Sequence, residues 1–136
     1  LIAMQQEAAK ESYLVVMKRH RPYPYLLTWA LDGYSLAMDF KIDETRRPAL
    51  IDLCNRMNDI VLAAGGRFYF AKDSTMRPKD VAAYLADALE RFREAKREWD
   101  PEHRLTSALA GRLHLFDPPS KGAWESRVRD GGKVTE

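Results

Sequence analysis

The clearest hydrophobic pattern in this 136-residue chain is a strict alternation from Tyr34 to Ile42. Apolar side chains occupy every second position, and the positions between them include Ser35 and Ala37. A period of two predicts a β-strand with one face in a core. The second face is small and polar, so it would meet solvent or line a cavity. Asp32-Gly33, directly before this segment, is a turn signal.

Helical periodicity predicts two long helices. In the first, apolar residues recur at helical spacing from 50 to 64, after Pro48 and before Gly65-Gly66. The second begins at 77–80, carries an apolar stripe from Val81 to Ala95 and closes at Trp99-Asp100-Pro101. Residues 1–11 predict another helix, and the leucines between 105 and 115 predict a short last one.

Two further segments are rich in β-forming residues. Residues 13–17 predict a buried strand that runs to Lys18 or Arg19, and the aromatic run from Arg67 to Phe70 predicts a strand directly after Gly65-Gly66. Residues 26–31 predict a short strand or an extended segment. The order helix, strand, strand, helix, strand, helix predicts an α+β fold. We expect an incomplete ferredoxin-like antiparallel sheet with helices on one face, lacking its first strand.

Composition limits the class of protein. Apolar residues make up 46% and charged residues 31%, as in an ordinary globular domain, and a net charge of +2 argues against nucleic acid as a partner. One cysteine, Cys54, fits a reducing compartment, and the absence of an apolar run of ~20 residues predicts a cytoplasmic location, with contact at a membrane surface left open. We expect one domain over residues 1–116 and a flexible tail over 117–136. Because Leu1 opens inside an apolar pattern, we also expect a piece of a longer protein.

The segment from Gly65 to Asp73 reads Gly-Gly-Arg-Phe-Tyr-Phe-Ala-Lys-Asp. It resembles the C-terminal half of FAD-linked oxidases of the vanillyl-alcohol oxidase type, most of all the decaprenylphosphoryl-ribose oxidase subgroup. The resemblance covers roughly Leu1 to Phe116. It also includes these fragments: Val15-Val16-Met17-Lys18-Arg19, residues 32–40, Trp99-Asp100-Pro101, Ser107 and Arg112-Leu113.

The resemblance implies a substrate domain whose sheet covers the flavin ring of an FAD held by an N-terminal FAD-binding domain of the same parent protein. It implies that Lys72 stabilises negative charge on the flavin and that Tyr69 approaches both flavin and substrate. Lys18 would meet the substrate, a sugar- or polyol-like alcohol, and Ser35 and Ala37 would line its pocket. The subgroup has Asn and Cys where this chain has Ser35 and Ala37, so a different alcohol is expected.

Simpler interpretations stand beside these roles. Lys72 is otherwise a solvated strand-end lysine that pairs loosely with Asp73, Tyr69 is a core tyrosine, and Lys18 is a solvated base. Residues 69 and 72 differ by an odd number, so a regular strand would point them to opposite faces.

The histidines, at positions 20, 103 and 114, lack metal-ligand spacing, and Cys54 falls on the helical stripe as a small hydrophobe. A non-enzymatic ferredoxin-like module that binds a ligand or partner is the alternative function. The bare sheet edge also predicts pairing with a second copy. We expect the isolated chain to lack tight FAD binding and turnover.

Overall fold

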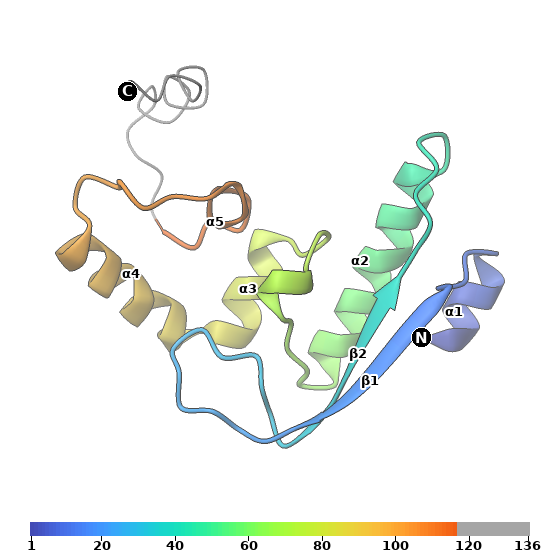
Figure 1. Cartoon of the computed structure of the whole chain (residues 1–136), viewed down its shortest axis with the longest axis horizontal. Coiled ribbons are helices and arrows are strands. Elements are labelled where there is room, and N and C mark those ends of the chain that lie inside the picture. The colour runs from blue at the N-terminus through green and yellow to red at the C-terminus, as the bar shows by residue number, and fades with distance from the viewer. Residues whose placement is uncertain (117–136) are drawn as a thin grey trace, which may run out of the picture.

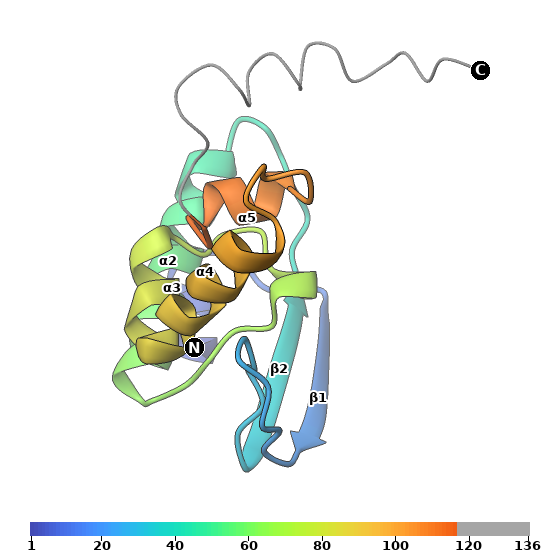
Figure 2. The ribbon, with the colours of Figure 1, turned by 90° about the vertical axis from the view of Figure 1, so that its left-hand side faces the viewer.

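A computed structural model describes residues 1–116 as an α+β fold with a two-stranded antiparallel sheet. The predicted tail, 117–136, lies outside the described residues. In chain order, the elements are α1 (Ile2–Glu7), β1 (Leu14–His20), β2 (Gly33–Asp39), α2 (Arg47–Ala63), the 3₁₀ helix η1 (Phe70–Lys72), α3 (Pro78–Leu85), α4 (Asp87–Trp99) and α5 (Ala108–Arg112). Figure 1 shows α3 between α2 and α4, and Figure 2 shows α2, α3 and α4 to one side of the sheet.

Strands β1 and β2 pair in a register that places Leu14 opposite Asp39 and His20 opposite Gly33. A loop of residues 21–32 joins them, and the possible strand over residues 26–31 does not form. Prolines 22 and 24 explain why this connection is long, because proline cannot donate to a ladder.

Helix α2 follows its sequence signals closely. Proline stands in its first turn, and the chain leaves it through Gly65 at φ +73°. The Gly65 amide donates to Leu62 O over 2.9 Å and the Gly66 amide to Val61 O over 2.8 Å, which satisfies the last carbonyls of the helix. The prediction that the glycine pair ends this helix is confirmed.

The predicted strand from Arg67 to Phe70 is wrong. Within the described chain this segment has no ladder partner, although Tyr69 keeps an extended backbone at φ −93° and ψ 109°. Phe68 and Phe70 pack against the core while Tyr69 points outward, 48% exposed. The period-two pattern therefore survives in the side chains, but β propensity without a neighbouring strand does not build a sheet.

The single helix predicted from residue 77 to 99 is also wrong, because the chain breaks at Ala86. Ala86 has φ +44° and ψ −120°, a conformation that ends α3 and starts α4 in a new direction. Both helices can then turn apolar side chains into one cluster. Its buried members are Met76, Val81, Leu85, Leu89, Ala110, Leu113, Leu115 and Phe116.

A second, smaller core joins α2 to the sheet. Leu53, Cys54 and Met57 are buried there, and Met38 and Phe40 of the alternating segment pack on them. The prediction that the whole apolar face of this segment lies in a core fails at its other end, where Tyr34 is 72% and Leu36 47% exposed. Strand β1, predicted to be buried, is exposed over most of its length. The helices of the described chain reach only one end of the sheet, so the rest of its apolar face stays open.

Candidate functional site

One face of the sheet carries three of the five residues assigned to the site. Lys18 lies opposite Ser35 and Val16 opposite Ala37 in the antiparallel register, and directly opposed residues share a face. His20 lies two positions beyond Lys18 and therefore joins them. We call the side formed by Val16, Lys18, His20, Ser35 and Ala37 the polar face.

His20 links this face to the loop that follows it. Its Nε2 lies 2.8 Å from Ser35 Oγ, and its ring meets the edge of Trp29 with 4.2 Å between centroids. Trp29 in turn packs against Tyr69 at 4.9 Å. A continuous series of contacts thus runs from Ser35 on the sheet, through His20 and Trp29, to Tyr69 in the segment after α2.

The packing of the loop against that segment has a second anchor. Arg67 Nη1 donates to the carbonyl oxygen of Thr28 over 3.3 Å, one residue before Trp29. A cavity of about 270 Å³ lies beside it, with Arg67 and Arg91 among its lining residues. Tyr84 also lines it and donates to the carbonyl of Phe68 over 3.3 Å. Burial, and next the charge of Asp73, raise the pKa of the Tyr84 hydroxyl, so this group stays protonated.

Lys72 lies at the end of η1, exposed, one 3₁₀ turn from Tyr69. The Lys72 amide donates to Tyr69 O over 3.0 Å. The 3₁₀ turn that follows Tyr69 thus replaces the regular strand whose parity would have pointed residues 69 and 72 to opposite faces. Among residues 1–116, the Lys72 ammonium has no side-chain hydrogen bond or ion pair.

Asp73, the neighbour expected to pair with Lys72, is held elsewhere. Its carboxylate forms an ion pair with Arg112 of α5 and accepts from the backbone N–H of Thr75 and Met76 over 3.0 and 2.7 Å. Lys72 is therefore exposed to solvent, as the simpler interpretation expected, but Asp73 pairs with Arg112 instead of with Lys72.

Sequence reasoning assigned no role to His20 and did not single out Trp29. The signal for His20 was present, because it follows Lys18 by two residues in a strand and must share its face. Trp29 carried no such signal, since a loop after two prolines has no periodicity from which a side-chain direction follows.

Cys54 is buried in the α2 core, and burial raises the pKa of its thiol, as expected of a small buried hydrophobe. Across the described range, no group of three or more His, Cys, Asp or Glu side chains is placed to hold a metal ion. No helix within that range has both the length and the apolar character needed to cross a membrane.

Comparison with known proteins gives little functional information. No family model matches the chain. Over 92 residues it is 36% identical to a Streptomyces coelicolor protein described as "Uncharacterized protein in mprA 5'region". The alignment covers 68% of this chain and 24% of that protein, so the chain spans about a quarter of the length of its relative.

Proposed function

We propose that this chain is the substrate-binding part of an FAD-dependent oxidoreductase that oxidises a sugar- or polyol-like alcohol. The observation that carries the proposal is the 2.8 Å contact between His20 Nε2 and Ser35 Oγ, on the face where Lys18 lies opposite Ser35. A cation, a hydroxyl and an imidazole on one partly exposed surface suit a ligand with several hydroxyl groups.

The residues around this face also suit a flavin ring. Trp29 and Tyr69 form a joined aromatic surface, and Tyr69 is half exposed. Aromatic faces pack well on flat ring systems, and Lys72, one turn from Tyr69, brings a positive charge to the same region. When bound, FAD supplies the acceptor for the hydride that leaves the alcohol carbon.

The chain's own residues would bind and orient the alcohol. When His20 Nε2 accepts the hydrogen bond of the Ser35 hydroxyl, the Ser35 oxygen can still accept a hydrogen bond from a substrate O–H. The Lys18 ammonium then binds a neighbouring hydroxyl. Ala37, on the same face, leaves room where a larger side chain would exclude substrate.

A ferredoxin-like sheet is part of this proposal. Both strands are edge strands within the described chain, and unpaired edges invite a further strand. We infer that the N-terminal FAD-binding domain of the parent, or a second copy of this chain, completes the sheet.

The test is expression of the complete parent protein and its purification with FAD in excess. We expect a yellow protein whose flavin absorbance is bleached under anaerobic conditions by one or more sugar alcohols. A colourless protein that binds no FAD would overturn the proposal. A bound flavin that no alcohol reduces would overturn the assignment of substrate class.

A non-enzymatic binding module is the second candidate. The side of the sheet opposite the polar face leaves Val15, Met17, Tyr34 and Leu36 exposed, the last two at 72% and 47%. An open apolar surface of this kind often marks a protein interface. A parent protein without FAD, in which this side is protected from solvent by a partner, would favour the module over the enzyme.

A further inference from the structure

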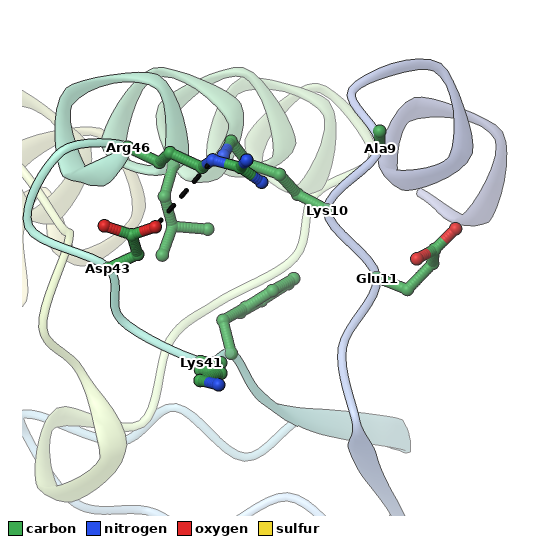
Figure 3. Close-up of a pocket in the computed structure, with 8 residues that line it drawn as sticks. Ala9, Lys10, Glu11, Lys41, Asp43 and Arg46 are labelled. Atoms are coloured by element: carbon green, nitrogen blue, oxygen red, sulfur yellow. Dashed lines mark ion pairs between the residues drawn. The ribbon is translucent and has the colours of Figure 1, made fainter.

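A second cavity lies away from the polar face, where two connections meet. It has a volume of about 360 Å³ and shares no residue with the polar face. The linker after α1 contributes Ala9, Lys10 and Glu11, and the chain from β2 into α2 contributes Phe40, Lys41, Asp43, Arg46 and Leu50. Figure 3 shows these side chains around the opening. The size falls within the range of small-molecule sites, roughly 300–1,000 Å³.

The lining is rich in positive charge. Lys10, Lys41 and Arg46 contribute three cations, and Lys10 and Arg46 reach toward one another from opposite sides of the cavity (Figure 3). Of the two acidic residues, Glu11 points away from the opening, toward α1 (Figure 3). Bringing like charges together is unfavourable without an anion between them.

Asp43 neutralises only part of this charge. It lies 3.8 Å from Arg46 Nε, but it also accepts from Thr45, over 3.0 Å at the amide and 2.7 Å at the hydroxyl. Among the residues that the structure describes, neither the Lys10 nor the Lys41 ammonium pairs with a carboxylate. Arg46 directly precedes α2, whose positive N-terminal end adds to the same field.

The cavity also has an apolar wall and a fixed backbone. Phe40 and Leu50 are partly buried in the α2 core and present apolar surface to the opening. Ala9 adopts φ +49°, and the Lys10 amide donates to Gln5 O over 3.0 Å. This turn sets the direction in which Lys10 leaves the backbone, so the position of the cation does not depend on a free linker.

We propose that this cavity binds a soluble phosphate monoester with a small apolar group. The phosphate lies between Lys10 and Arg46, which reach toward one another, and the apolar group packs on Phe40 and Leu50 (Figure 3). These two cations, together with the positive N-terminal end of α2, match a phosphate dianion better than a carboxylate monoanion. Arginine and lysine together also suit the several oxygens of a phosphate. The site is independent of the proposed oxidoreductase activity, because no residue is common to both.

The test titrates the whole chain with phenyl phosphate, inorganic phosphate and benzoate, and follows backbone amide resonances. We expect phenyl phosphate to shift the amides of residues 9–11 and 40–46 and to bind at least tenfold tighter than either other probe. Lys10→Gln and Arg46→Gln should each weaken phenyl phosphate binding about tenfold or more. Lys79→Gln, an exposed charge change in α3, should leave it unchanged.

Each contrary result is decisive. The site would be overturned if Lys79→Gln weakened phenyl phosphate binding as much as Lys10→Gln and Arg46→Gln do. It would also be overturned if neither Lys10→Gln nor Arg46→Gln weakened that binding. Binding of benzoate as tight as that of phenyl phosphate would overturn the assignment to phosphate. Binding of inorganic phosphate as tight as that of phenyl phosphate would overturn the role of Phe40 and Leu50. The amide spectra of the variants without ligand show that they are folded.

Discussion

His20 Nε2 lies 2.8 Å from Ser35 Oγ, across the two strands of the sheet. Ser35 is opposite Lys18 in the register, and His20 is opposite Gly33, two residues before Ser35. The imidazole therefore reaches diagonally across the strand pair to the serine hydroxyl.

Replacement of His20 by Phe should keep the packing against Trp29 and remove the nitrogen that bonds Ser35. If the proposed function holds, kcat of the complete parent should fall roughly tenfold, because the loss of one orienting hydrogen bond costs about 0.5–1.5 kcal/mol. His20→Gln, which can still bond Ser35, should recover part of the loss. Steady-state kinetics with the best alcohol provide the measurement. Equal kcat values for the Phe variant and the natural protein would exclude a role for the imidazole.

Ala86→Gly should stabilise the fold. Ala86 has φ +44° and ψ −120°, where a Cβ is strained and glycine is not, so we expect a gain of about 1 kcal/mol in the free energy of unfolding. Ala83→Gly, inside α3, is the matched control and should lose about 1 kcal/mol. Urea unfolding followed by circular dichroism compares the two. A loss of stability in both variants would mean that the break between α3 and α4 lies elsewhere.

Gly66→Ala should destabilise the chain where Gly33→Ala does not. A Cβ on Gly66 would meet Val61 Cγ1 at 2.5 Å and Val61 O at 2.8 Å, whereas one on Gly33 has no atom within 4 Å. Contact with a helix carbonyl cannot be relieved by a side-chain rotation, so the expected loss is about 1–3 kcal/mol. Thermal unfolding of both variants tests the difference, and equal midpoints would contradict it.

Low pH should destabilise the C-terminal half of the described chain, because Asp100 loses its charge there. A hydrogen bond from Lys96 lowers the pKa of Asp100 from 3.8 to about 2. Desolvation of the carboxylate opposes this effect, and hydrogen bonds from the backbone amides of Leu105 and Arg104 add to it. Because the folded pKa is the lower one, this stabilisation is present above pH 3.8 and is lost as pH falls toward 2. Asp100→Asn should therefore flatten the pH dependence of unfolding in that window.

The control for this prediction is Asp52→Asn, because Asp52 is exposed on α2. The measurement is the urea midpoint of each protein at a series of pH values from 5 to about 2. An unchanged slope in Asp100→Asn would show that other carboxylates govern acid unfolding.

The sequence predicted those elements whose signals are local. Pro48, the apolar stripe and Gly65-Gly66 define α2 because caps and periodicity act within a few residues. The antiparallel partners of β1 and β2 were likewise marked by composition and alternation. Within the site, Lys18, Ser35 and Ala37 were correctly expected on strands, since a period of two fixes which side chains share a face.

Most of the errors concern contacts between distant segments. Alternation in residues 34–42 separates two faces but does not say which one a helix will cover, so Tyr34 was wrongly placed in a core. The aromatic residues of 67–70 have the composition of a strand, yet a strand also needs a neighbour. Nothing local marks Ala86 as a break, because alanine is a strong helix former. The contact of Trp29 with His20 likewise depends on how a loop folds back.

Among residues 1–116, no strand pairs with the outer edge of β1, which borders the polar face. A third strand laid there, from any source, would point every second side chain to the same side as Lys18 and His20. Whatever chain occupies that position would contribute part of the lining that a ligand touches. The identity of the neighbour would then decide which molecules fit, and a change of neighbour could alter selectivity without any change in these residues.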